Sequence, residues 1–287
     1  MATVSRVPRS TGSGNQPAAA KRNWLSEIKR EVKSRPTAAI LYGVPGIGKT
    51  SMAAHVPGVV FLVDDNEDGI TTLKSSGLVP NVPQLPPMSS WQETLDALDS
   101  LATEPHDFRA IAIDAIGGFE HLCHDHVLTR DYNGDRGEHG FGGYQRGAEV
   151  AVADWRNFIN ALDRLRDERQ MSVFLLGHAK VGSFRNPEGP DYDRYVIDIH
   201  KYTWTLTEKW ADIVLFANFE VSFTAKEMTK AKGKAKGGQN RMIYTEHHAA
   251  FDAKNRHNLP AEIEMGSSGA EAWSNFVNAL KSAKEEK

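Results

Sequence analysis

The segment GVPGIGKT has the residue types and the spacing of a phosphate-binding loop. It fits the pattern G-x-x-x-x-G-K-[ST] at every fixed position. Glycines let backbone N–H groups curl around phosphate oxygens, Lys49 brings a positive charge to the β- and γ-phosphates, and the Thr50 hydroxyl suits Mg²⁺. We therefore expect ATP and Mg²⁺ as cofactors. The expected nucleotide-binding residues are Gly43, Val44, Pro45, Gly46, Ile47, Gly48, Lys49, Thr50 and Ser51.

Carboxylates follow two further apolar runs. Asp114 ends the run AIAI, where a P-loop protein needs a second metal-binding group beside Thr50, although it could instead cap the next helix. VDDNEDG follows the run VVFLV. There Glu67 is our candidate for the base that activates the attacking water, and Asp65 is the alternative. An acidic cluster of this kind can also be a solvated turn.

A histidine follows a fourth apolar run, in SVFLLGH. If this run is a strand of the same sheet, His178 lies at its carboxyl end and projects toward the nucleotide. We expect it to sense the γ-phosphate or to couple nucleotide state to another site. The alternative is an ordinary loop histidine.

Strands and helices must bring these residues to one place. Short apolar runs predict buried strands, and apolar residues at helical spacing predict the helices between them, one of which starts with the capping box Ser90 and Glu93. Strands that alternate with helices favour a parallel sheet with helices on both faces. The carboxyl ends of its strands share one edge. The strands are expected at residues 38–42, 59–63, 110–113, 172–176 and 213–216.

The pattern changes at both ends of the chain. Residues 1–22 are basic and rich in Ser, Gly, Pro and Ala, which predicts a disordered tail. Residues 23–265 form the expected core, with antiparallel edge strands near its end around a Lys-rich loop at 222–242. Residues 266–287 carry a last helix, which Ser268 and Glu271 would cap.

Composition limits the function further. The 287 residues carry a net charge of -3, so any nucleic acid must bind to a local basic patch. Cys123 is the only cysteine, which excludes an internal disulfide. The sequence contains no apolar run long enough to span a membrane and no apolar signal core, so we expect a cytoplasmic protein. EHLCHDH matches no standard zinc spacing and favours a helical face.

In this order, the motifs resemble a RecA-type ATPase core, and more closely the compact bacteriophage P-loop proteins related to RecA and RadA. The matching text runs over residues 38–260 and comprises ILYGVPGIGKTSMAA, FLVDDNEDG, AIAIDAIGGFEHL, FGGYQRG, VFLLGHAKV, KWADIVLFAN and AKNRHNLP. Some members of that family are ATP-dependent single-strand annealing or recombination proteins. Two departures are the extra acid in DDNEDG and His178 where RecA proteins carry Gln.

The resemblance also gives a role to AKNRHNLP. In RadA-like proteins a Lys-Asn-Arg stretch reaches the ATP of the neighbouring subunit, and Lys254 and Arg256 match it. The resemblance thus implies a homo-oligomer, ring or filament, in which Arg256 acts in trans as a finger with Lys254 as its companion. It also implies a single-strand binding protein as a partner and, for a phage protein, the bacterial host cytoplasm. Alternatively, both residues are solvated surface cations or form ion pairs with nearby acids.

Single-stranded DNA has two candidate sites. The segment after His178 interleaves cations with aromatic residues, as strand-binding surfaces do, although acidic residues lie among them. Its candidates are Lys180, Arg185 and Arg194. The Lys-rich loop is the second site, unless it only increases solubility. Its candidates are Lys230, Lys232, Lys234 and Lys236.

The sequence thus predicts a RecA-like α/β P-loop ATPase that binds single-stranded DNA in recombination or annealing. A nucleotide or small-molecule kinase is one alternative, with the Lys-rich loop as its lid. A non-hydrolysing ATP switch for assembly and a helicase-loading or packaging motor are the others.

Overall fold

The computed structural model describes residues 23–28, 35–67, 69–222 and 236–285. By its internal contacts the chain divides into Met1–Ser34 and Arg35–Lys287. The element described in the first unit is the 3-10 helix η1 (Trp24–Glu27), and the predicted tail at 1–22 lies outside the described residues. No helix in the described ranges is both long enough and apolar enough to cross a membrane.

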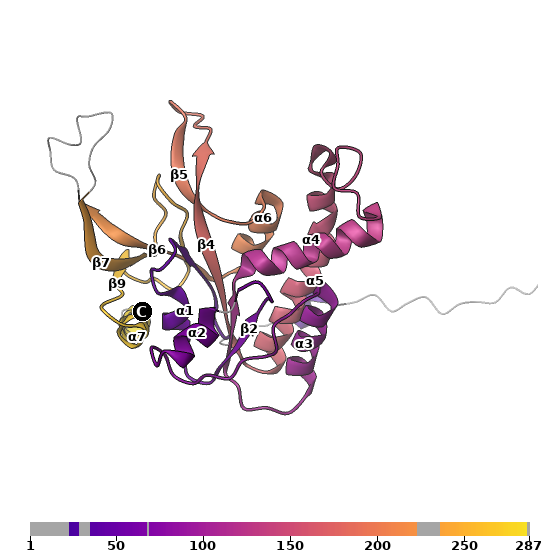
Figure 1. Cartoon of the computed structure of the whole chain (residues 1–287). Helices are drawn as coiled ribbons and strands as arrows, with labels where there is room; N and C mark the ends of the chain where they lie inside the picture. Colours follow the sequence, from indigo (N-terminus) through magenta and orange to yellow (C-terminus); the bar gives the residue numbers. More distant parts are fainter. Residues whose placement is uncertain (1–22, 29–34, 68, 223–235, 286–287) are drawn as a thin grey trace, which may run out of the picture. The chain divides into compact units, whose positions relative to one another are not determined.

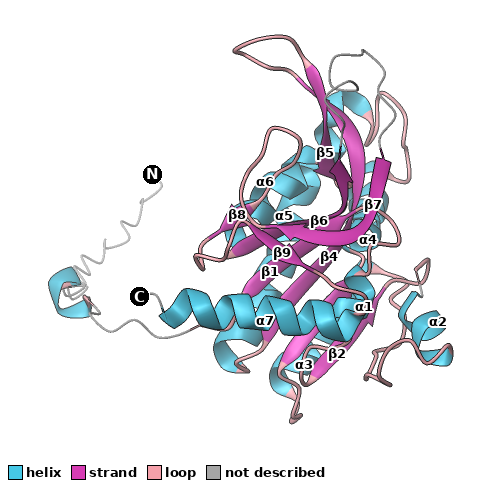
Figure 2. Ribbon diagram, turned by 90° about the vertical axis from the view of Figure 1, so that its left-hand side faces the viewer, coloured by secondary structure: helices cyan, strands magenta, loops and turns pink. Residues whose placement is uncertain are grey.

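A nine-stranded sheet organises the described part of the second unit (Figures 1 and 2). Five strands are parallel, in the order β2-β3-β4-β1-β6, and the other four pair antiparallel with β4, β6 or β7. The parallel strands are β1 (Ala38–Gly43), β2 (Val59–Val63), β3 (Ala110–Asp114), β4 (Ser172–Phe184) and β6 (Ile213–Ser222). The antiparallel strands are β5 (Tyr192–Ile197), β7 (Lys236–Tyr244), β8 (Lys254–Asn255) and β9 (Glu262–Glu264).

Helices cover both faces of this sheet. One face packs against α1 (Lys49–Ala53), α2 (Gly69–Ser75) and α7 (Gly269–Glu285). The other packs against α3 (Trp91–Thr103), α4 (Ile116–Tyr132) and α5 (Arg146–Glu168). The 3-10 helix η2 (Gly143–Gln145) precedes α5. Helix α6 (Lys201–Trp210) packs against α5.

Successive side chains of a strand point to opposite faces, and this alternation builds two hydrophobic cores. In β1, Ile40 and Tyr42 join the core under α3 to α5, whereas Ala39 and Leu41 join the core under α1 and α7. Every residue of β1 is buried, as expected for a parallel strand covered on both sides. The predicted α/β fold class, with a mostly parallel sheet, helices on both faces and antiparallel strands near the C-terminus, is confirmed.

The helix starts follow the predicted capping chemistry with one change. Ser90 Oγ accepts a hydrogen bond from Glu93 N at 3.2 Å, and the Glu93 carboxylate accepts a 2.9 Å hydrogen bond from the backbone N–H of Ser89, one residue before the cap. Ser267, Ser268 and Glu271 repeat this arrangement before α7.

Strand β4 is longer than its apolar run predicts. The run ends at Leu176, yet the strand continues to Phe184 because β5 pairs with it from Ala179 onward. Antiparallel pairing satisfies the backbone of this polar extension, which needs no apolar burial on both faces. Figure 1 shows the resulting β4–β5 hairpin projecting from the sheet.

Candidate active site

The strand register brings the predicted residues to one edge of the sheet. β4 lies between β1 and β3, and His178 is the register partner of Gly43, the first residue of the P-loop. Asp114, at the end of β3, pairs with Leu176 of β4. The carboxyl ends of β1 and β3 therefore supply the loop and the carboxylate, and β4 supplies the histidine at the point where its parallel pairing ends.

The P-loop depends on glycine at defined positions. A methyl group on Gly43 would lie 2.1 Å from the carbonyl oxygen of Ala217 on β6, so a larger residue would force the two strands apart. Gly46 and Gly48 have φ angles of 74° and 103°, a region that other residues rarely occupy. Gly48 is the N-cap of α1. The loop thus has the curled backbone that phosphate binding requires.

Lys49 points back into this loop. Its buried Nζ donates hydrogen bonds to the carbonyl oxygens of Gly43 and Val44, at 3.1 and 3.2 Å. Burial lowers the pKa of Lys49, while the negative charges of Asp114 and Glu67 oppose that shift. An anionic phosphate beside the ammonium would stabilise its charge in the same way.

Thr50 and Asp114 form the candidate metal site. Thr50 Oγ1 donates a 2.6 Å hydrogen bond to Asp114 Oδ2, and burial raises the pKa of Asp114. The N-cap of α4 is Ala115, with no side-chain cap, so Asp114 does not serve as that cap. A hydroxyl and a buried carboxylate are hard oxygen donors, and they fit Mg²⁺.

Glu67 and His178 complete the pocket. Nε2 of His178 lies 2.8 Å from Oε1 of Glu67, and this hydrogen bond lowers the pKa of Glu67 and raises the pKa of His178. Together with Thr50, Gly69 and Asp114 they line a pocket of about 300 Å³. Asp65, the alternative base, is exposed and does not line it.

Lys254 and Arg256 lie at the other end of the sheet. Asn255 of β8 pairs with Ile213, at the start of β6, whereas Ala217 of β6 pairs with Gly43 of the P-loop. Ile213 and Ala217 are four residues apart on β6, which is about 13 Å along the strand. The chain after Asn255 runs antiparallel to β6 and so leads away from the P-loop.

The two cations of this segment differ in their surroundings. Lys254 Nζ donates to the carbonyl oxygens of Glu208 (2.6 Å), Lys209 (3.2 Å) and Ala211 (2.6 Å) at the C-terminus of α6. An ammonium has three donors, so a direct role at a neighbouring nucleotide requires these contacts to break.

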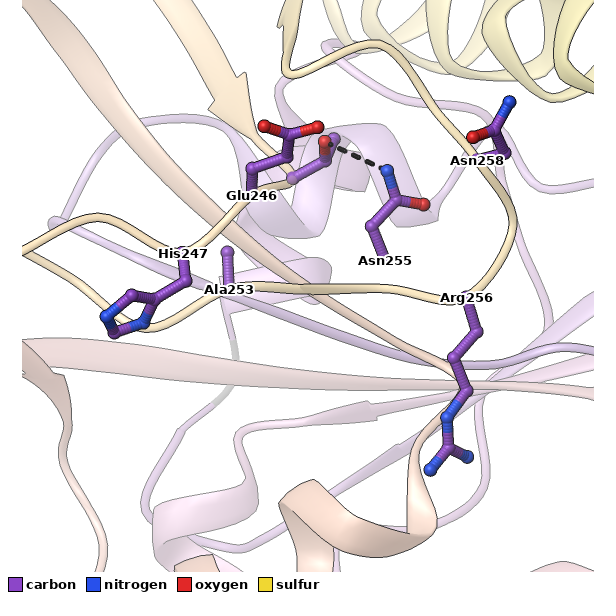
Figure 3. Close-up of a pocket in the computed structure, with 7 residues that line it drawn as sticks. Glu246, His247, Ala253, Asn255, Arg256 and Asn258 are labelled. Carbon is purple, nitrogen blue, oxygen red and sulfur yellow. Dashed lines mark hydrogen bonds between the residues drawn. The ribbon is translucent and has the colours of Figure 1, made fainter.

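Arg256, by contrast, is exposed and lines an open pocket of about 610 Å³. Figure 3 shows its side chain extending away from Glu246, Asn255 and Asn258, while Asn255 donates to Thr245. The guanidinium is therefore available to another molecule.

The candidate DNA-binding residues also separate. Arg194 is buried, forms an ion pair with Asp252 and stacks on Phe184, so the structure does not offer it to a ligand as we had expected. Lys180 forms a half-exposed ion pair with Asp198 at 2.7 Å, and Arg185 is exposed.

The second candidate surface is mostly outside the structure. Lys230, Lys232 and Lys234 lie outside the described residues, as does Asp68 of the acidic turn, and Lys236 begins β7.

Two residues that could take part in function were missed in the sequence. Tyr144 is 92% exposed, has a φ of 48°, and carries the Arg146 guanidinium 6.0 Å from its ring centre. An aromatic residue inside the glycine-rich FGGYQRG was the available signal. Arg241, which contacts Ile47 of the P-loop, looked like one more cation of the Lys-rich segment.

A known family and a solved structure are similar to this chain. A search of curated proteins gave no match. The crystal structure of the RadB recombinase is similar, with 12% sequence identity, a TM-score of 0.44, and coverage of 83% of this chain and 90% of that one. A family model described as an AAA domain matches residues 35–257, which include the P-loop, Asp114, His178 and Arg256. Since this match spans well over half of the chain, the protein belongs to the AAA-domain family.

Proposed function

We propose that the protein is a RecA-like ATPase that binds single-stranded DNA in recombination or annealing and hydrolyses ATP between subunits. One observation carries the catalytic part of this proposal. Thr50, Asp114, Glu67 and His178 come from four separate segments of the chain and line a single pocket beside the P-loop. Such a group of oxygen donors, candidate base and candidate sensor suits a phosphate that is bound and attacked there.

The residues divide the work of hydrolysis. The P-loop N–H groups and Lys49 bind the phosphates, and Thr50 and Asp114 would hold Mg²⁺. When bound, Mg²⁺ neutralises charge on the phosphate oxygens. Glu67 has a lowered pKa and is ionised at neutral pH, so it can accept a proton from the attacking water. His178 holds Glu67 by a hydrogen bond that must rearrange when the carboxylate turns to that water.

Arg256 supplies the remaining charge from a neighbouring subunit. Its position at the far end of β6 separates it from its own P-loop, and its exposure leaves it free to enter the site of another copy. A cation delivered in this way stabilises charge on the γ-phosphate and is worth roughly 10³ or more in rate. In this proposal Lys254 assists by fixing β8, the strand from which Arg256 extends.

Single-stranded DNA would lie along the β4–β5 hairpin. Arg185 and Lys180 supply positive charge there, and half-buried Phe184 and Tyr192 supply rings on which bases could stack. Tyr144, in the 3-10 helix η2 before α5, is a further exposed ring on which a base could stack. A partner single-strand binding protein remains part of the proposal through the family resemblance alone. The Lys-rich segment remains part of it through its run of positive charges at Lys230, Lys232, Lys234 and Lys236.

The test is steady-state ATP hydrolysis with and without single-stranded DNA. Wild type is compared with Arg256→Ala, with Lys49→Ala, and with an equal mixture of the two variants. We expect DNA to stimulate the wild type and each variant alone to be inactive. In the mixture about a quarter of the interfaces pair an intact P-loop with an intact Arg256, so activity should return to that level.

Other outcomes favour other functions. Normal hydrolysis by Arg256→Ala would remove the trans-acting finger. Phosphate transfer to a small molecule by a monomer would indicate a kinase, and stable oligomers with unhydrolysed ATP would indicate an assembly switch. Movement along duplex DNA would indicate a motor.

A further inference from the structure

Arg241 of β7 contacts the outer side of the P-loop. Its Nη1 donates to the carbonyl oxygen of Ile47 at 3.3 Å, and its Nε and Nη2 donate to the carbonyl oxygen of Gly266 at 3.0 and 2.6 Å. The guanidinium also packs tightly on the loop, because a methyl group added to Gly48 would lie 2.7 Å from Nη1. One half-buried side chain therefore joins the P-loop to the connection between β9 and α7.

The bond to Ile47 has a consequence on the other side of the loop. The peptide unit between Ile47 and Gly48 is planar, and in a trans peptide the C=O and the N–H point in opposite directions. Arg241 holds the Ile47 C=O outward, so the Gly48 N–H is directed to the inner, phosphate-facing side. Gly48, with its φ of 103°, has few conformational limits of its own, and an outside contact is what can fix this peptide.

Gly266, whose carbonyl oxygen anchors Arg241, lies in a segment that is itself held in place. The backbone N–H of Met265 donates to the carbonyl oxygen of Arg241 at 2.8 Å, and Glu271 accepts a hydrogen bond from Ser267 N at 2.7 Å. Helix α7 then packs closely on α1, since a methyl group on Gly269 would lie 2.3 Å from the carbonyl oxygen of Ser51. Gly266 therefore has little room to move relative to the P-loop.

We propose that Arg241 is a positioning residue that keeps the Gly48 N–H aimed at the nucleotide phosphates. It acts through the peptide between Ile47 and Gly48 and does not itself touch the nucleotide. The anchor at Gly266 and helix α7 lie beyond residues 35–257 that match the family model. In this proposal the C-terminal segment contributes to nucleotide binding through Arg241. The inference rests on the proposed function only in requiring that the P-loop binds ATP.

The test compares Arg241→Gln and Arg241→Lys with the wild type. The dissociation constant of a fluorescent ATP analogue is measured with Mg²⁺, and KM and kcat are measured for ATP. We expect Arg241→Gln to raise the dissociation constant and KM about tenfold, the loss expected for hydrogen bonds from a charged donor, with a smaller change in kcat. Lys keeps the charge, but its single nitrogen cannot reproduce the planar, spread set of donors with which the guanidinium reaches Ile47 and Gly266, so Arg241→Lys should recover only part of the affinity.

Two further measurements separate positioning from folding. Hydrogen exchange of the nucleotide-free protein should accelerate at P-loop amides in both variants and stay unchanged in β1 and β3. Arg164→Gln is the control. It removes an exposed arginine of α5 that pairs with Asp99 of α3 and Glu168 of α5, and it should change none of these readouts. If Arg241→Gln lowers the melting temperature of the whole protein, the comparison rests on Arg241→Lys.

Three results would overturn the inference. Wild-type affinity in Arg241→Gln would show that the contact has no role in binding. Full recovery in Arg241→Lys would mean that charge alone matters. If wild-type protein bound no nucleotide, the proposed function would fail and this inference with it, whereas the first two results leave the proposed function intact.

Discussion

The charge of each side chain in the pocket depends on its immediate neighbours. Burial raises the pKa of Asp114 and lowers that of Lys49, so both ionised forms are disfavoured by desolvation. Glu67 and His178 show the opposite behaviour, because each stabilises the charged form of the other. A pair that interacts in this way titrates together, and pH must act on both partners.

The sign of this pH dependence differs between the two groups. The raised pKa of His178 stabilises the fold below the ordinary histidine value of 6.5, and the contribution is lost as pH rises through the raised value. The lowered pKa of Glu67 stabilises the fold above the ordinary value of 4.5, and that contribution is lost as pH falls through the lowered value. The pair therefore contributes most between these limits.

Glu67→Gln should bring the pKa of His178 back toward 6.5, because the substitution removes the carboxylate that favours the imidazolium. Titration of the His178 ring followed by NMR measures the change. Nucleotide binding should persist in this variant while hydrolysis falls by at least about 10². A His178 titration identical to that of the wild type would contradict the assigned contact.

Most of the pocket could be predicted at this scale, and Arg241 and Arg194 could not. Asp114 ends β3, His178 follows the apolar run of β4, and Lys49, Thr50 and Glu67 lie in the segments that follow β1 and β2. Parallel strands bring these positions to one edge of the sheet. Arg241 meets Ile47 across 194 residues of chain, and the partner of Arg194, Asp252, lies 58 residues away. No local pattern distinguishes such paired arginines from free ones.

At the scale of elements, contacts between distant segments decide where strands and helices end. The sequence placed the end of β4 at the last residue of its apolar run, but pairing with β5 carries it to Phe184. Likewise, the last carbonyl groups of α6 are bound by Lys254, which belongs to β8. Local patterns locate the buried centre of an element better than ends that depend on a partner.

Lys254→Ala should lower the free energy of unfolding by about 1 kcal/mol, because carbonyl groups at the C-terminus of α6 lose a cationic donor. Urea denaturation measures this loss. Lys201→Ala, on the exposed first turn of the same helix, is the control and should change stability by less than about 0.5 kcal/mol.

The same variant also tests the role of Lys254 in hydrolysis. If Lys254 only fixes β8, Lys254→Ala should reduce DNA-stimulated hydrolysis far less than Arg256→Ala does. An equal loss in both variants would show that Lys254 leaves α6 and acts at the nucleotide directly.

For the whole molecule, a net charge of -3 provides no general attraction to DNA. Affinity must come from local cations, and each contact with a phosphate adds to the salt dependence. Arg185→Ala should therefore weaken binding to single-stranded DNA and reduce the slope of log affinity against log salt by about 0.7. Fluorescence anisotropy at several salt concentrations measures both, with Arg164→Ala as a control. An unchanged slope would remove Arg185 from the binding surface.

Arg256 lies at the opposite end of the sheet from the P-loop, so in the proposed oligomer each subunit would use two different contact surfaces. Contacts between unlike surfaces repeat head to tail, and they either close into a ring or grow into an open helix. In a closed ring every bound ATP faces an arginine. An open helix always ends in one subunit whose ATP faces solvent. Turnover per subunit in the proposed enzyme therefore keeps rising as a helix lengthens, whereas a ring reaches full turnover at a fixed size.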